Sequence, residues 1–170
     1  MPAMKRLLIM RHAEAEYGGG DHDRALTERG VAAARAVGTG MAARGIGVDA
    51  ILSSTAVRAM QTAVHVRDRL FPEDASPADL NTDAALYNGA VPAWRAAVTG
   101  LAEEWDDVLV VGHNPAVALL AAELHGGVIS VTPATVLDVR LEDWAAFADG
   151  GVDAGLVRLA DVWPPDVFGA

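Results

Sequence analysis

Two apolar runs in the sequence end in side chains that can do chemistry. Arg11 and His12 follow the run Leu7–Met10, and His113 follows the run Val108–Val111 after a single glycine. A neutral imidazole can attack phosphorus and form a covalent phosphohistidine, and a second imidazole can donate a hydrogen bond to the phosphoryl oxygens. A guanidinium pairs with such oxygens and stabilises their negative charge. These residue types therefore favour chemistry on a phosphoryl group.

A third apolar run, Ala50–Leu52, leads toward a further arginine. We expect Ser54 to cap a helix that runs through Leu70, which places Arg58 in or just past the first turn. The helix N-terminus carries partial positive charge, so a cation there is unfavourable by about 0.3–1 kcal/mol. An anion bound between Arg58 and the helix N-terminus would make the interaction favourable. The stretch GHNP offers a second helix start, with Asn114 as N-cap and proline at the first helical position. The combination indicates a site for a tetrahedral dianion such as phosphate.

The apolar runs and the stretches between them are typical of an α/β fold. None of the three runs alternates with polar residues, as expected for strands of a parallel sheet with both faces covered. The carboxyl ends of such strands face one crevice, so we expect the two arginines and two histidines to converge there. Further expected elements are a helix from Thr27, as N-cap, to about Arg44, a loop from Phe71 to Leu80, a short strand near Asn81–Ala84, a helix from Pro92 to Trp105, and a helix with a glycine stop after Glu123–His125.

The C-terminal part has a different pattern. The segments TVLDVRLEDW (135–144) and AGLVRLADVW (154–163) alternate around a turn at Asp149–Gly151, which predicts an antiparallel pair of strands at a sheet edge. The predicted fold class is therefore α/β, three-layered, with a mostly parallel sheet flanked by helices and an antiparallel C-terminal edge pair. No repeat or linker interrupts the 170 residues, so we expect a single domain over residues 1–170.

Composition excludes several classes of function. The net charge of −10 argues against nucleic acid or an anionic membrane as a partner. The absence of cysteine excludes a disulfide, a thiolate metal site and a cysteine nucleophile. The run Leu7–Met10 is shorter than the roughly 7 to 15 apolar residues of a signal peptide or the roughly 20 of a membrane span. We expect a cytoplasmic protein without a membrane partner.

Four stretches of the sequence resemble the histidine phosphatase superfamily. They are MRHAEA (10–15), which stands for the RHG-type signature, ALTERG (25–30), LSSTAVRAMQTA (52–63) and VVGHNPAV (110–117). The short chain and the RHAEA and GHNP variants look most like SixA-type phosphohistidine phosphatases. The resemblance implies that His12 is the nucleophile, that Arg11, Arg58 and His113 complete the phosphate pocket with it, and that an α/β sheet carries them.

The sequence departs from that family at two points. Ala13 stands where the wider superfamily commonly has glycine. Many members have a glutamate after the third strand as general acid, whereas NTDAALYNG, residues 81–89, has none, and Asp83 is its nearest carboxylate. Glu14 or Glu16 could serve instead, or no carboxylate is needed.

A missing acid favours one class of substrate. Protonation of an alkoxide leaving group is worth about 10²–10⁴-fold, whereas the imidazole of a phosphohistidine can arrive already protonated. The loop from Phe71 to Val91 is also short, so we expect the crevice to stay open to a phosphoryl group on a protein. The prediction is a phosphatase without metal or cofactor that uses a covalent phosphohistidine intermediate and dephosphorylates phosphohistidine on a protein.

Two alternatives remain open. The first is a phosphomonoesterase with the same mechanism and a small phosphate ester as substrate, and the second is a phosphate sensor that binds without turnover. A mutase is disfavoured, because no segment is long enough to enclose a sugar phosphate. The stretch GGGDHDR around His22 is interpreted as a flexible polar loop, because it has neither tetrahedral metal-ligand spacing nor the lysine of a P-loop. The pattern assigns no oligomeric state.

Overall fold

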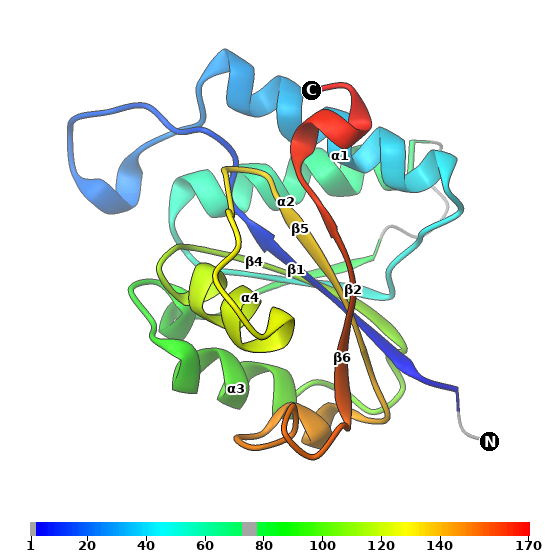
Figure 1. Cartoon of the computed structure of the whole chain (residues 1–170). Helices are drawn as coiled ribbons and strands as arrows, with labels where there is room; N and C mark the ends of the chain where they lie inside the picture. Colours follow the sequence, from blue (N-terminus) through cyan, green and yellow to red (C-terminus); the bar gives the residue numbers. More distant parts are fainter. Residues whose placement is uncertain (1–2, 73–77) are drawn as a thin grey trace.

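The chain forms a six-stranded sheet with helices on both faces (Figure 1). The computed structural model describes residues 3–72 and 78–170. The strand order is β3-β2-β4-β1-β5-β6, in which β1 to β4 are parallel and β5 is antiparallel to both of its neighbours. The strands are β1 (Lys5–Arg11), β2 (Ala50–Ser53), β3 (Asp79–Thr82), β4 (Asp107–Gly112), β5 (Val136–Leu141) and β6 (Val157–Trp163).

Four α-helices complete the three layers, and Figure 1 shows α1 and α2 on one side of the sheet and α3 and α4 on the other. Along β1, Leu8 and Met10 pack in the core beneath α1 and α2, whereas Leu7 and Ile9 pack in the core beneath α3 and α4. Covering both faces accounts for the unbroken apolar run. The helices are α1 (Glu28–Ala43), α2 (Val57–Leu70), α3 (Val91–Thr99) and α4 (Ala116–His125), and the short 3-10 helices are η1 (Asp21–Asp23), η2 (Ala84–Leu86), η3 (Trp144–Phe147) and η4 (Pro165–Phe168).

The predicted fold class is confirmed, including the antiparallel C-terminal strands, of which β6 forms the sheet edge. Thr27 caps α1 as expected, since its hydroxyl accepts a hydrogen bond from the Gly30 amide at 2.9 Å. Position 30 must be glycine, because a Cβ there would lie 2.1 Å from the Glu14 carbonyl oxygen. This close approach seats the start of α1 against the loop that follows β1. The glycine stop after His125 is also present, with Gly126 in the left-handed conformation.

Several predicted boundaries are wrong, and each has a local cause. The helix expected from Pro92 to Trp105 ends at Thr99, where Gly100 breaks it. The strand expected near Asn81–Ala84 begins two residues earlier, at Asp79. The segment expected to extend to Trp144 leaves the sheet after Leu141, because Asp143 caps η3 and the Trp144 ring is fully buried. Part of the expected 71–80 loop lies outside the described residues.

The two helix starts next to the expected site also differ from the prediction. The helix after β2 begins at Val57 with Ala56 as its N-cap residue, so Ser54 does not cap it. The Ser54 hydroxyl instead accepts a hydrogen bond from the Ala56 amide and bonds to His113. Pro115 is the N-cap residue of α4 rather than its first residue, yet the Asn114 side chain still accepts a hydrogen bond from the Ala118 amide at 3.1 Å.

Among the helices of the described residues, none is long and apolar enough to cross a membrane.

Candidate functional site

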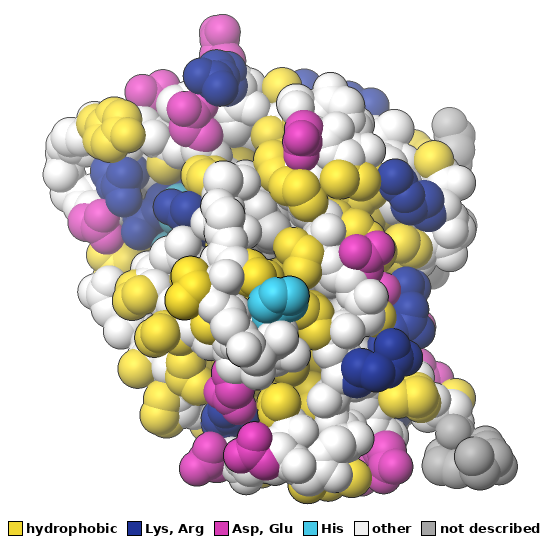
Figure 2. Space-filling model, viewed as in Figure 1, with side chains coloured by type: hydrophobic (Ala, Val, Ile, Leu, Met, Phe, Trp, Pro, Cys, Tyr) yellow, Lys and Arg dark blue, Asp and Glu magenta, His cyan; other side chains and the backbone are white. Residues whose placement is uncertain are grey.

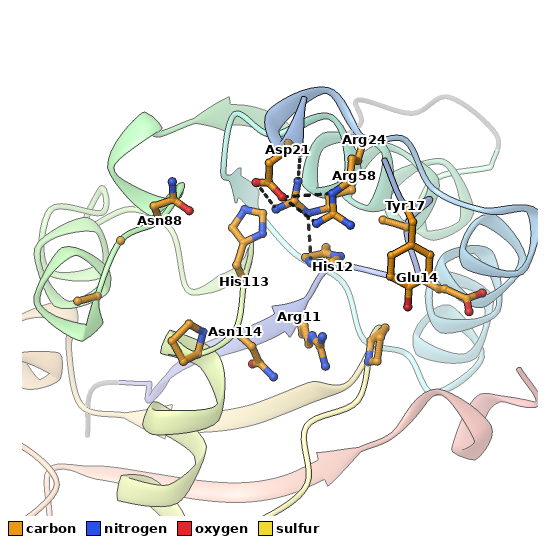
Figure 3. A pocket seen from close by; sticks show the side chains of 15 residues that line it. Arg11, His12, Glu14, Tyr17, Asp21, Arg24, Arg58, Asn88, His113 and Asn114 are labelled. Atoms are coloured by element: carbon orange, nitrogen blue, oxygen red, sulfur yellow. Dashed lines mark hydrogen bonds and ion pairs between the residues drawn. The ribbon is translucent and has the colours of Figure 1, made fainter. Parts of the chain in front are cut away.

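The carboxyl ends of β1, β2 and β4 open into a cleft of about 530 Å³. Figure 2 shows lysine or arginine side chains gathered beside the loop between β1 and α1, at the left of that view. Figure 3 shows the cleft from close by, with the two histidines at its centre and arginines on either side. Lining residues include Arg11, His12, Arg58 and His113 from the floor, and Glu14, Tyr17, Asp21, Arg24, Asn88, Asn114 and Pro133 from the rim.

Parallel pairing of β1 with β4 brings the two histidines together. Arg11 pairs with Gly112 in the strand register, and the His12 amide donates to the Gly112 carbonyl at 2.9 Å. The rings of His12 and His113 then lie 5.1 Å apart between centroids. Position 112 must be glycine, because a Cβ there would lie 2.4 Å from the Trp94 ring. The structure therefore brings these residues, about a hundred positions apart in sequence, to one end of the sheet.

The imidazole of His12 is held in one tautomer. Its Nδ1 lies 2.7 Å from the Ala13 carbonyl oxygen, which can only accept, so Nδ1 carries the proton. The Nε2 lone pair is then free, and the Arg58 Nε–H group donates to it at 3.4 Å. Burial lowers the pKa of His12 to about 4, and the charges of Arg58 and Arg11 act in the same direction. At neutral pH His12 is an uncharged base whose Nε2 faces Arg58.

His113 is the more deeply enclosed of the two histidines, with 8% of its surface exposed. Its Nε2 lies 2.8 Å from the Ser54 hydroxyl. Burial lowers its pKa to about 3, with further contributions from His12 and Arg58. Its Nδ1 is buried and has no hydrogen-bond partner among the described residues. Leaving such a polar atom unpaired in a protein interior costs free energy.

The two arginines of the floor are held by different parts of the chain. Arg11 donates from Nη1 to the Val131 carbonyl at 2.8 Å, and its buried Nε has no partner among the described residues. The Arg58 side chain, which is 6% exposed, lies in the first turn of α2 as predicted. Two guanidiniums beside two neutral imidazoles give the cleft a net positive lining, which suits a bound dianion.

Sequence reasoning missed Asp21, a residue of η1 in the glycine-rich loop. Its carboxylate accepts from the Tyr87 hydroxyl at 2.6 Å, from Arg58 at 3.3 Å, and from Arg24 at 3.0 and 3.2 Å (Figure 3). The Tyr87 hydrogen bond, followed by the charges of Arg58 and Arg24, lowers the pKa of Asp21 to about 2. Tyr87 and Arg58 lie 66 and 37 positions away in sequence, so no local spacing pointed to them.

The candidate acids from the sequence occupy different places. Asp83 lies outside the cleft, where it caps η2 through a hydrogen bond from the Ala85 amide at 2.8 Å and lines another hollow beside Trp105. Glu14 does line the cleft, and its carboxylate accepts from the Thr27 hydroxyl at 2.9 Å. Glu16 is exposed and is not among the lining residues. Of the three, the structure thus brings only Glu14 to the histidines' cleft.

His22 contacts the turn before α2 and the residue that follows η2. The His22 Nε2 atom lies 3.0 Å from the Thr55 hydroxyl, and its ring packs edge-on against Tyr87 at 4.8 Å between centroids. In the described part of the chain no three histidine, aspartate or glutamate side chains lie together as possible metal ligands.

Comparisons with known proteins bear on the same residues. The family model "Histidine phosphatase superfamily (branch 1)" matches residues 7–86, which include Arg11, His12 and Arg58. An uncharacterised protein of Mycobacterium tuberculosis is 33% identical over 156 residues, which cover 91% of this chain and 89% of the relative.

Two solved structures are similar over nearly the whole chain. A structure from Nakamurella multipartitia, provisionally named phosphohistidine phosphatase SixA, has a TM-score of 0.78 and 29% identity and covers 97% of this chain and 99% of its own. A structure of the protein histidine phosphatase SixA in complex with tungstate has a TM-score of 0.78 and 25% identity, with coverage of 95% and 98%. This chain belongs to the histidine phosphatase superfamily.

Proposed function

We propose that the protein is a metal-independent phosphatase that passes the phosphoryl group of its substrate through His12. The observation that carries the proposal is the state of His12, whose Nδ1–H is held by the Ala13 carbonyl while its neutral Nε2 lies against Arg58 and beside His113. A lone pair fixed in this direction is a preorganised nucleophile. The similarity to SixA structures supports the same reading.

The reaction has two steps that use the same groups. In the first, the His12 Nε2 lone pair forms a bond to phosphorus while the bond from phosphorus to the leaving atom breaks, and that atom takes the electron pair. Arg11, Arg58 and His113 stabilise the charge on the three equatorial oxygens. The phosphorylated ring is cationic, and the Ala13 carbonyl accepts its Nδ1–H. In the second step water attacks phosphorus, phosphate forms, and His12 leaves as a neutral ring.

We further propose that the substrate is a phosphohistidine. A phosphohistidine protonated on its other ring nitrogen releases a neutral imidazole, so no acid has to protonate the leaving atom. Asp21 is held ionised by Tyr87 and the arginines, and a carboxylate with a pKa near 2 is a poor proton donor at neutral pH. Glu14 is already an acceptor for Thr27. The carboxylates at the cleft therefore suit a P–N bond better than an ester.

A phosphoryl group carried on a protein fits the shape of the site. Glu14 and Pro133 line both the cleft and a second hollow of about 380 Å³ near the C-terminus, so the two hollows adjoin and offer a surface beside the cleft for a protein substrate. We propose a phosphorylated cytoplasmic protein as the partner. Turnover of the two kinds of substrate distinguishes this protein phosphatase from a small-ester enzyme and from a phosphate sensor.

The test is a labelling experiment with ³²P-phosphohistidine peptide, stopped in alkaline denaturant, in which P–N bonds survive. We expect a base-stable, acid-labile label on the peptide that contains His12, and none in His12→Ala. Faster turnover of p-nitrophenyl phosphate than of the peptide would indicate the small-ester enzyme. Phosphate binding without turnover of either compound would indicate a sensor, and loss of activity with a chelator would contradict metal independence.

A further inference from the structure

We propose that Asp21 is a positioning residue, whose carboxylate sets the orientation of the Arg58 guanidinium that the phosphoryl transition state requires. The inference rests on the proposed function for the identity of the reaction. It assigns Asp21 no proton transfer and no contact with the phosphoryl group.

The first support is the way in which Asp21 holds one edge of the guanidinium. Arg58 donates from Nη1 to the Asp21 main-chain carbonyl at 2.7 Å and from Nη2 to its Oδ2 at 3.3 Å. The guanidinium is planar, so two contacts on its Nη groups also fix the direction of Nε–H. That group points at the His12 Nε2, where the attack on phosphorus begins. Moving Asp21 would therefore rotate the Arg58 donors away from the reacting atoms.

The second support is that two residues besides Arg58 hold the carboxylate of Asp21. Tyr87, from the segment before α3, donates to Oδ2 at 2.6 Å, and Arg24 donates to Oδ1 at 3.0 and 3.2 Å. The Tyr87 ring also packs edge-on against His113 at 5.8 Å between centroids. Asp21 thus joins the loop after β1 to α2 and to the segment before α3, and Figure 3 shows it across the cleft from Arg11.

An asparagine cannot replace this arrangement. Both oxygens of Asp21 accept hydrogen bonds, whereas an amide has one accepting oxygen and one NH2 group, which would face either the Arg24 or the Tyr87 donor. In either orientation the uncharged amide weakens the side-chain contact with Arg58, while the main-chain contact at 2.7 Å remains. The hydrogen bond from Tyr87 keeps the pKa of Asp21 low, so the carboxylate is present throughout the pH range of an ordinary assay.

Loss of the Asp21 carboxylate should affect binding of the transition state and not binding of phosphate. The negative charge of Asp21 repels a phosphate dianion, so its removal does not weaken phosphate binding through charge. The transition state depends on donors aimed at the equatorial oxygens, so it is the state that suffers when Arg58 is misaligned. Orthovanadate, which adopts a trigonal-bipyramidal geometry when a nucleophile binds it, serves as the probe of that state.

The experiment compares orthophosphate and orthovanadate binding to wild type, Asp21→Asn and Asp23→Asn by calorimetry. Asp23 is the matched control, because it lies in the same short helix with its side chain 85% exposed. For Asp21→Asn we expect vanadate affinity to fall about tenfold to hundredfold, with phosphate affinity within about threefold of wild type. Equal losses for both anions, or no loss for either, would overturn the proposal, as would the same pattern in Asp23→Asn.

Two further measurements guard the result. If Asp21→Asn does not fold, Tyr87→Phe removes one donor to the carboxylate and keeps the ring on His113, and we expect a smaller loss for vanadate alone. Phenyl and p-nitrophenyl phosphate distinguish positioning from acid catalysis. Asp21→Asn should slow both by the same factor, and a much larger loss on the more basic phenolate would contradict positioning. If wild type binds the anions but hydrolyses nothing, the proposed function fails while the vanadate comparison still decides the role of Asp21.

Discussion

Two clusters of buried charge, one near the start of β1 and one at its carboxyl end, pair arginine with aspartate in opposite ways. Between β1 and β5 the buried member is a carboxylate, Asp138, whose side chain is 5% exposed. Arg6 donates to both of its oxygens at 3.1 Å, and Arg140 adds contacts at 3.2 and 3.3 Å while its side chain stays 30% exposed. In the cleft the buried member is Arg58, and its carboxylate partner Asp21 is 55% exposed.

Which partner is buried, the carboxylate or the arginine, distinguishes a structural ion cluster from a binding site. The Asp138 cluster saturates its buried acceptor, and the arginines around it reach water. The cleft encloses its cations and leaves Arg11 Nε and His113 Nδ1 unpaired within the described residues. An enclosed guanidinium whose carboxylate partner is more than half exposed favours a further anionic ligand. We therefore expect mutations in the first cluster to change stability and mutations in the cleft to change activity.

The largest expected effect is that of His12→Ala. Without the nucleophile no covalent intermediate forms, so we expect turnover of phosphohistidine peptide to fall by roughly 10⁴-fold or more. The fold should survive, because the ring lines the cleft and its loss removes only two hydrogen bonds, one to the Ala13 carbonyl and a long one from Arg58. Steady-state kinetics and a circular dichroism melt measure both quantities. Turnover near the wild-type rate would rule out His12 as the nucleophile.

A matched pair of arginine variants, one from each cluster, tests whether the cleft controls activity and the other cluster does not. Arg58→Ala should lower kcat by about 10²–10³-fold, the usual cost of losing one transition-state donor, with little loss of stability. Arg140→Ala, in the other cluster, should retain wild-type kcat. Added phosphate should raise the melting temperature of Arg140→Ala and wild type, and much less that of Arg58→Ala. Equal kinetic losses in the two variants would contradict the division.

The reverse effect is expected at Asp138. Removing this carboxylate leaves Arg6, whose side chain is 17% exposed, without its buried partner. We expect Asp138→Ala to lower the free energy of unfolding by about 2–4 kcal/mol, with kcat unchanged in the folded protein. Urea denaturation gives the value, and Glu142→Ala, at an exposed site just after β5, is the control, with a change within about 0.5 kcal/mol. A stable but inactive Asp138→Ala protein would be the opposite of this expectation.

The last prediction concerns the contribution of the two cleft histidines to the pH dependence of stability. Their pKa values fall to about 4 and about 3 on folding, from 6.5. Between these limits the unfolded chain binds more protons, so the free energy of unfolding decreases as pH falls from about 6.5 to about 4. Ring ¹⁵N shifts should show both histidines uncharged at pH 6, and His12→Asn should reduce the slope of stability against pH. A His12 midpoint near pH 6.5 would contradict the assignment.

The positions of the site residues can be predicted from the sequence where a strand end fixes them, and not where contacts between distant segments do. Arg11, His12 and His113 stand directly after buried strands, and parallel pairing leaves little freedom in where such residues lie. The helix near Arg58 starts two residues later than the sequence predicts, because Ser54, a good N-cap by type, bonds to His113 and accepts from the Ala56 amide instead. Side-chain contacts between distant segments compete with local capping, and the sequence around Ser54 contains no trace of them.

Asp21 shows the limit more clearly. It lies in a polar loop after three glycines, without periodicity, and every residue type there is typical of solvent-exposed turns. Its role comes from Arg58 and Tyr87, which reach it from other elements of the fold. Asp83 was the carboxylate nearest the family's acid position, but the chain turns at η2 and leaves it to cap that helix. Its position in the sequence therefore suggested a place in the cleft that its side chain does not occupy.

The central claim is that four side chains form one oxyanion site with His12 as the attacking group. A crystal structure with tungstate tests it most directly. The account predicts tungsten next to the His12 Nε2, with its oxygens in contact with Arg11, Arg58 and His113. An ordered tungstate bound elsewhere, or one in the cleft that contacts neither arginine and lies away from His12, would contradict it.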